Sequence, residues 1–318
     1  MPEFRQNLAT KDWVVIATER RQRPQDFKRP AAAPPASGPC PFCPGGTDAG
    51  GKGEAVRVLP NKYPVLIPSP AVAKDRHPLY RSLPGEGVHE VIVDSPDHAA
   101  SLATMPADHA RVLAGVWRER FRASLANERV ALTVLFKNHG TGSGASILHP
   151  HTQLVGSSVV PSHIRHRMDE ASRYYDSAGA CVFCRMLEAE LKEKIRVIEE
   201  NDHFAAFALY ASLSPFHVWV LPKRHTASFG DANDKELESF AALLQRLTRR
   251  LQAALGDAPY NFVLQSTPLD RGTTEAFHWY LSLVVRLGGG SGFEMGSGIF
   301  TNVVVPEEAA AFLQAAKV

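Results

Sequence analysis

Short apolar strands and amphipathic helices alternate along this chain, and their order occurs twice. Each copy predicts a β-branched strand, a histidine, a helix, a second strand, a polar loop and a further strand that begins at a histidine. The first copy comprises strand Glu90–Val93, helix Val112–Leu125, strand Ala131–Phe136 and a strand from His149, and the second comprises strand His217–Leu221, helix Leu237–Leu251, strand Asn261–Leu264 and a strand from His278. The repeated order predicts two related halves.

This pattern predicts the α+β class, with helices packed on antiparallel sheets in each half. We expect residues 1–160 to form the first half and residues 161–318 the second, joined into one continuous unit rather than two free domains. Two helical segments within residues 162–197 are expected to bridge the halves. A short closing helix is predicted at Pro306–Ala316.

Composition and charge are those of an ordinary globular protein. The 318 residues are 44% hydrophobic and 21% charged, and 35 Lys and Arg against 33 Asp and Glu give a net charge of +2. This near-balance does not suggest a dedicated nucleic-acid partner. The apolar runs are too short to span a bilayer, and the first residues contain no apolar signal region. We therefore expect a cytoplasmic protein without a membrane partner.

The four cysteines form two Cys-x-x-Cys pairs. Disulfides are unusual in a large cytosolic chain, which leaves metal half-sites or redox pairs as the interpretations. Two cysteines on a turn and two distant histidines can complete a tetrahedral zinc site, and each copy of the repeat supplies two such histidines. The two predicted sites are Cys40, Cys43, His98 and His149, and Cys181, Cys184, His225 and His278. The repeat favours structural zinc, about two ions per chain.

Between residues 136 and 155, a glycine-rich loop leads into a histidine-rich strand. Glycines at 140, 142 and 144 let backbone N–H groups approach an anion closely, which makes Gly144 a candidate phosphate contact. Side chains alternate along a strand, so His149, His151 and Gln153 are expected on one face. The sequence therefore predicts a candidate nucleophile beside a phosphate site.

His149-Pro-His151-Thr-Gln153 resembles the His-Pro-His-x-Gln signature of the galactose-1-phosphate uridylyltransferase branch of the histidine-triad superfamily. This branch includes ADP-glucose phosphorylase-like and adenylyltransferase-like members. Other segments along nearly the whole chain resemble its arginine pair, its zinc turn, its third zinc ligand and its sugar-contacting segment. They are Glu19-Arg20-Arg-Gln-Arg23-Pro24, Cys40-Pro-Phe-Cys43, Ser95-Pro-Asp-His98 and Gly292-Phe293-Glu294.

The resemblance implies two histidine-triad-like halves and a covalent intermediate. In that family the second histidine of the motif attacks the α-phosphorus of a nucleotide, and this role falls on His151. The first histidine binds zinc, matching His149, and the glutamine holds the phosphoryl oxygens, matching Gln153. Nucleotide or phosphate contacts are implied for Arg20, Arg23, Asn61, Asn138 and Ser146, and an acceptor contact for Glu294.

A glutamine at position 153 bears on the type of reaction. A histidine there could act as a general acid for poor leaving groups, whereas glutamine cannot, so transfer between phosphates is favoured over hydrolysis. We expect a ping-pong nucleotidyltransferase of the hexose-1-phosphate uridylyltransferase type. An adenylyltransferase is the alternative, either an ADP-sugar phosphorylase or an enzyme that transfers adenylyl from adenylylsulfate to phosphate. A catalytically silent nucleotide- or zinc-binding module is the alternative of another class.

The second half departs from the first at the nucleophile position. His278-Trp-Tyr280 occupies the place of His149-Pro-His151, so we interpret the second half as degenerate and structural, with a part in shaping the acceptor pocket. The expected partners are a nucleotide and sugar-phosphate, phosphate or sulfate substrates. The resemblance also implies a homodimer. No role is assigned from the sequence to several other histidines, including His89 and His217.

Overall fold

The computed structural model of the protein describes residues 1–17, 19, 24–27, 40–48, 54–69, 79–268, 274–288 and 291–318. The candidate phosphate contacts Arg20 and Arg23 lie outside the described residues. Within these ranges, every helix is too short or too polar to cross a membrane.

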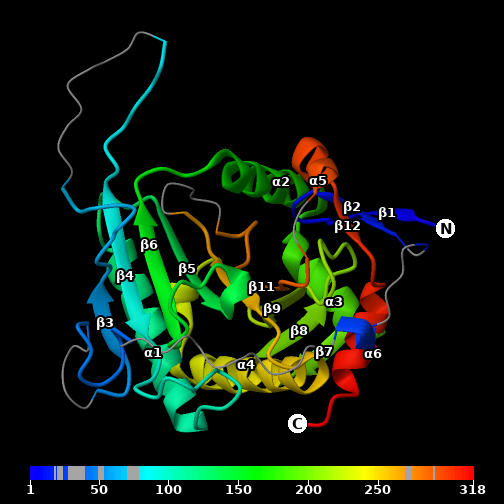
Figure 1. Ribbon diagram of the computed structural model, residues 1–318. Helices are drawn as coiled ribbons and strands as arrows, with labels where there is room; N and C mark the ends of the chain where they lie inside the picture. Colours follow the sequence, from blue (N-terminus) through cyan, green and yellow to red (C-terminus); the bar gives the residue numbers. More distant parts are fainter. Residues whose placement is uncertain are drawn as a thin grey trace.

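Nine antiparallel strands form one sheet that runs through both halves of the chain (Figure 1). In spatial order they are β3 (Arg57–Pro60), β4 (Gly87–Val93), β6 (His151–Ser157), β5 (Leu132–His139), β10 (Tyr260–Gln265), β11 (Tyr280–Val285), β9 (Val218–Pro222), β8 (Phe204–Ala208) and β7 (Val197–Glu200). The halves join where β5 pairs with β10, from Tyr260 opposite His139 to Leu264 opposite Leu135. The predicted α+β class is confirmed. The sheet expected in each half continues into the other through the hydrogen bonds between β5 and β10.

Two strands begin later than the sequence predicts. β6 starts at His151 and β11 at Tyr280, rather than at His149 and His278. Pro150 has no N–H and cannot donate to the ladder between strands. The N–H of Trp279 donates instead to the carbonyl of Thr226 at 2.9 Å. Both earlier histidines are thereby left free to turn toward cysteines.

Long helices cover one face of the sheet (Figure 1). α1 (Ala107–Leu125) follows Pro106, and α4 (Asp234–Leu255) begins at a capping box made by Asn233 and Glu236. They pack on each other and on alternate residues of the strands, together with α6 (Pro306–Gln314). The largest buried side chains of this main core include Trp117, Phe121, Phe240, Phe262 and Trp279.

The opposite face of the sheet differs between the halves. In the second half, α2 (Ser162–Ala178) and α3 (Val182–Glu193) lie over it, and their apolar residues form a separate cluster with those of β8, β9 and β11. In the first half, loops cover this face only in part, and a cleft opens between them. The fold therefore places the cleft on the sheet face that the long helices do not use.

A small second sheet lies at the far end of the molecule (Figure 1). It consists of β1 (Glu3–Gln6), β2 (Trp13–Ile16) and β12 (Phe300–Asn302), with β12 parallel to β2. The one-turn helix α5 (Gly292–Ser297) comes just before β12. Arg5 donates to Glu307 of α6 at 2.9 Å, which ties the small sheet to the helix layer.

Candidate active site

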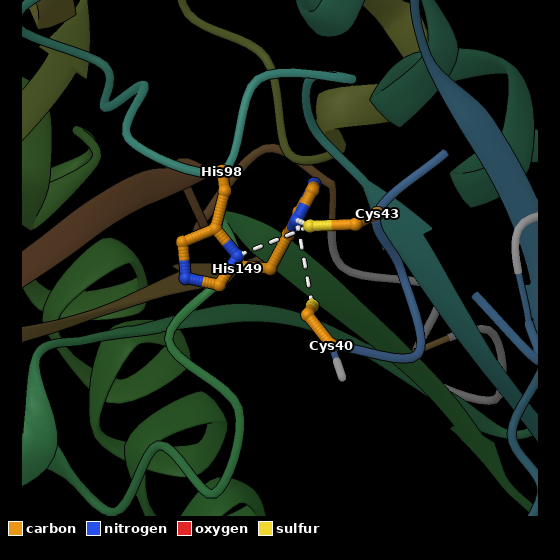
Figure 2. A group of neighbouring side chains, drawn as sticks. All are labelled: Cys40, Cys43, His98 and His149. Atoms are coloured by element: carbon orange, nitrogen blue, oxygen red, sulfur yellow. Dashed lines mark hydrogen bonds between the residues drawn. The ribbon is translucent and has the colours of Figure 1, made fainter. Parts of the chain in front are cut away.

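The first cysteine pair meets two histidines from later parts of the chain (Figure 2). The Sγ atom of Cys43 lies 3.4 Å from Nδ1 of His98 and 3.6 Å from Nδ1 of His149, and the Sγ atom of Cys40 lies 3.7 Å from the latter. Zinc bonds of about 2.3 Å to sulfur and 2.0–2.1 Å to nitrogen place tetrahedral ligands about 3.6 Å apart. This set could therefore hold one metal ion.

The far side of the His149 ring fixes which nitrogen faces the cysteines. Its Nε2 lies 2.7 Å from the backbone carbonyl oxygen of Ser95 and donates to it, so Nδ1 presents a lone pair to the cluster. Burial lowers the pKa of His149, which favours the neutral form that binds metals.

The second cysteine pair forms a matching cluster. The Sγ atom of Cys184 lies 3.3 Å from Nδ1 of His225 and 3.4 Å from Nδ1 of His278. One ligand atom from each of these residues and Cys181 lies within 4.8 Å of all the others. A hydrogen bond from Cys184 lowers the pKa of Cys181, which favours the thiolate form that binds a metal. The structure thus brings together both predicted sets.

A cleft of about 710 Å³ opens beside the first cluster. Four of the sequence-predicted residues line it: Asn61, Ser146, His151 and Gln153. The cysteine turn contributes Phe42, whose ring packs edge-on against His151 with the ring centres 5.6 Å apart. The cluster therefore helps to place one wall of the cleft.

His151 is the first residue of β6 and is buried at the base of this cleft. Its Nδ1 lies 2.9 Å from the backbone carbonyl oxygen of His149 and donates to it, which leaves Nε2 as the atom with a free lone pair. Burial lowers the pKa of His151, so the imidazole is neutral near pH 7. A neutral imidazole with an unprotonated nitrogen is a nucleophile.

A buried ion pair supports the backbone beneath His151. The ammonium group of Lys137 on β5 donates to Asp94 Oδ2 at 2.6 Å and to the His151 carbonyl oxygen at 3.0 Å. Thr152 donates to the other carboxylate oxygen of Asp94 at 2.8 Å. Lys137 is 1% exposed and Asp94 fully buried, so each charge depends on the other.

We expect the substitution Lys137→Met to lower the free energy of unfolding by about 3–5 kcal/mol, because it leaves a buried carboxylate without its counter-ion. The matched control is Arg185→Ala, which removes an exposed pair with Glu188 and is expected to cost less than about 1 kcal/mol. Urea denaturation of both variants measures the difference. Equal losses of stability would contradict the role of the buried pair.

A residue of the second half forms hydrogen bonds with Asn138 and with the glycine-rich loop. Asn261 on β10 donates to Asn138 Oδ1 at 2.6 Å and to the carbonyl oxygen of Ser143 at 2.9 Å. Gly140 opens the loop at a φ of 76°, which favours glycine. The Oδ1 atom of Asn138 is therefore occupied, and its N–H groups remain for a ligand. Neither Asn138 nor Gly144 is among the residues that line the cleft.

His89 on β4 is a cleft residue that sequence reasoning missed. Its Nε2 lies 2.9 Å from Oε1 of Gln153, and its Nδ1 accepts from the N–H of Val65 at 3.1 Å. The contact depends on β4 lying beside β6, which a single sequence does not reveal. The sequence repeat provides no signal for it, because it places His217 opposite Glu90; the strand register makes His217 the counterpart of His89.

In the second half, aromatic side chains occupy the position that corresponds to His151. Tyr280, the first residue of β11, is buried and stacks on Trp219 with ring centres 4.1 Å apart. Phe183 of the second cysteine turn stacks on the other two rings, at 5.5 Å from Tyr280 and 6.1 Å from Trp219. Burial raises the pKa of Tyr280, so its hydroxyl stays protonated. Aromatic packing thus fills the space that the first half leaves open.

Glu294 lies apart from the cleft within this chain. It is the N3 residue of α5, and its carboxylate accepts hydrogen bonds from the backbone N–H (2.9 Å) and the hydroxyl of Ser291. These contacts lower the pKa of Glu294 to about 2. Its predicted role as an acceptor contact stays a prediction.

Comparison with known proteins identifies the family. Residues 1–161 match the family model of the galactose-1-phosphate uridyl transferase N-terminal domain, and residues 167–286 match that of its C-terminal domain. The chain is 31% identical to an ADP-glucose phosphorylase of Arabidopsis thaliana, over 97% of this chain and 91% of the relative. It is 29% identical to a galactose-1-phosphate uridylyltransferase of Thermotoga maritima, over 100% of this chain and 99% of the relative.

Solved structures agree with the sequence matches. A crystal structure of an ADP-glucose phosphorylase from Arabidopsis thaliana with bound ADP-glucose superposes with a TM-score of 0.83 at 28% identity, covering 100% of this chain and 99% of that one. A uridylyltransferase structure superposes with a TM-score of 0.81 at 29% identity, covering 99% and 98%. The chain therefore belongs to the galactose-1-phosphate uridyl transferase family of nucleotidyltransferases.

Proposed function

We propose that this enzyme transfers a nucleoside monophosphate from a nucleotide sugar to a phosphate-bearing acceptor, by way of a covalent nucleotidyl-His151. The observation that carries the proposal is the His151 ring at the base of the cleft, with Nδ1 bound to a carbonyl oxygen and Nε2 unprotonated. Family membership supports the reaction class.

In the first half-reaction, Nε2 of His151 attacks the α-phosphorus of the bound nucleotide sugar. A P–N bond forms as the bond from the α-phosphorus to the bridging oxygen breaks, and hexose 1-phosphate leaves as an anion. The Nδ1–H bond to the His149 carbonyl stabilises the positive charge that develops on the imidazole. No proton has to be delivered to the leaving group, so the glutamine at position 153 does not impede this step.

In the second half-reaction, a phosphate oxygen of the acceptor attacks the same phosphorus and the P–N bond breaks. The N–H groups of Gln153 hold the phosphoryl oxygens during both displacements, and Ser146 faces the same cleft. Asn138, whose Oδ1 is bound to Asn261, does not line the cleft and stays a predicted phosphate contact. Arg20 and Arg23 remain the predicted phosphate contacts outside the described residues.

We propose zinc as the ion of both cysteine–histidine clusters, because two thiolates and two imidazoles at tetrahedral spacing are its usual ligands. When bound at the first cluster, zinc would hold the cysteine turn against the base of β6. The cleft residues described here do not include the cysteines or His98, which supports a structural role. The homodimer and the cytoplasmic location stay predictions from the sequence.

Two donors are candidates. A uridylyl donor such as UDP-glucose is supported by the family models that match both halves. An adenylyl donor such as ADP-glucose is supported by the Arabidopsis relative, which is named ADP-glucose phosphorylase. The cleft volume of about 710 Å³ admits either nucleotide and does not select the base.

Incubation of the protein with each donor, labelled with ³²P at the α-phosphate, tests the function. The donors are UDP-glucose, ADP-glucose and adenylylsulfate. We expect protein-bound label that is stable in base and lost in acid, as a phosphoramidate requires, and the donor that labels most strongly identifies the base. No label from any of them at millimolar concentration would leave the non-catalytic binding module as the function.

A further inference from the structure

We propose that His89 is a positioning residue that orients the side-chain amide of Gln153, so that the N–H groups of Gln153 point at the phosphoryl group. This inference rests on the proposed nucleotidyl transfer and deepens it. It begins from a contact between two neighbouring strands, β4 and β6, with Val91 opposite Gln153 in the register.

The hydrogen bonds of His89 fix its tautomer. The backbone N–H of Val65 donates to Nδ1 at 3.1 Å, so Nδ1 carries a lone pair and the ring proton lies on Nε2. The atom 2.9 Å from Nε2 must then be an acceptor, which assigns it as the oxygen of the Gln153 amide. The two N–H bonds of Gln153 are consequently turned away from His89, into the cleft.

Asn61 completes this arrangement. Its Oδ1 accepts from the N–H of Tyr63 at 2.8 Å, which fixes its Nδ2 at 3.1 Å from Nε2 of His89. In this tautomer both nitrogens are donors, so Asn61 cannot accept the Nε2 proton of His89. Gln153 is thus the acceptor for the Nε2 proton.

The second half contains a corresponding histidine, which lies away from the cleft that contains His151. The N–H of Leu213 approaches His217 Nδ1 at 3.4 Å, and His217 Nε2 lies 2.9 Å from the hydroxyl oxygen of Ser282. Ser282 pairs with Trp219 as Gln153 pairs with Val91, so the two histidines hold equivalent places in the repeat. Among the described residues, the first half places the amide of Gln153 on this histidine, where the second half places the hydroxyl of Ser282.

The consequence is chemical. An amide side chain can rotate by half a turn and present its oxygen instead, which would repel the phosphoryl oxygens. The Nε2 proton of His89 makes that orientation unfavourable. In the rotated amide, the N–H groups of Gln153 would lie against the Nε2–H group of His89, and two donors cannot form a hydrogen bond. A preorganised donor costs no reorganisation when negative charge builds up on the phosphoryl group.

The test compares His89→Leu with His89→Gln. Leucine removes the proton donor, whereas glutamine carries an N–H donor at the same distance along its side chain. We expect the rate of protein labelling from the α-³²P donor to fall about tenfold or more in His89→Leu and to stay within about threefold of wild type in His89→Gln. Ser282→Ala is the matched control, which removes the equivalent contact away from the cleft and is expected to label at the wild-type rate.

A structural effect is separated from a positioning effect by a double-mutant cycle. If His89 acts through Gln153, adding His89→Leu to Gln153→Ala lowers the labelling rate by no more than about twofold. A wild-type rate in His89→Leu, or a full tenfold loss on the Gln153→Ala background, would overturn the inference while the proposed function stands.

A readout without turnover covers the case in which no donor labels the wild-type protein. The proposed function would then fail, and long-range ¹H–¹⁵N NMR correlations of His89 would still decide the orientation. We expect the Nε2–H tautomer. Protonation at Nδ1 would overturn the inference.

Discussion

The substitution His151→Ala is expected to abolish formation of the protein-bound nucleotide. Two described neighbours in the cleft cannot replace this imidazole: Gln153 is not a nucleophile, and His89 uses both ring nitrogens in hydrogen bonds. Loss of a nucleophile that acts in both half-reactions is expected to lower the rate by about 10⁴-fold or more. Labelling from the preferred α-³²P donor and steady-state exchange between sugar nucleotides measure the loss.

His166→Ala serves as the matched control, since His166 is an exposed histidine of α2. It should label at the wild-type rate. Circular dichroism and thermal unfolding of both variants should match wild type closely enough to exclude global unfolding as the cause. Exchange at the normal rate in His151→Ala would show that the phosphorus bonds to another atom.

Loss of the first metal cluster is expected to be the other large effect. Cys43 lies within 3.6 Å of the ligand nitrogens of both His98 and His149, so Cys43→Ser weakens the connection between three separate segments. Structural zinc is worth about 10–16 kcal/mol in zinc-finger peptides, comparable with the whole stability of a domain. We expect this variant to retain about one zinc per chain, to unfold at markedly lower temperature and to lose nucleotidyl transfer.

Cys184→Ser is the informative comparison. It disturbs the second cluster, which joins the start of α3 to His225 and His278 and lies away from the cleft that contains His151. We expect the same loss of one zinc by elemental analysis and a lower unfolding temperature, with a smaller effect on the labelling rate of the protein that remains folded. Wild-type protein that contains no zinc, or two variants with identical rates, would contradict this division of roles.

Local patterns in the sequence account for much of the site. The two Cys-x-x-Cys turns and the repeated histidines predict the residues that meet in each cluster. The alternation along β6 predicts His151 and Gln153 on one face, and the resemblance to the family adds Ser146; all three line the cleft. These signals suffice because each depends on spacing within a short segment or on a repeat of such segments.

Local sequence patterns do not predict contacts between strands that are distant in the sequence. The pairing of β4 with β6 brings His89 within hydrogen-bond distance of Gln153. The pairing of β5 with β10 does the same for Asn261 and Asn138. Neither follows from composition or periodicity, because strand order is a property of the whole fold. The sequence pattern also places the start of β6 two residues too early, because Pro150 has no N–H to donate to the ladder between strands.

The junction of β5 with β10 also bears on how the two halves depend on each other. A first half released from its neighbour would present β5 as a bare edge, with the N–H and C=O groups now bound to β10 open to any other chain. Such edges promote aggregation. In this chain β10 covers that edge, so the half with Tyr280 at the nucleophile position protects the half with His151 from such contacts.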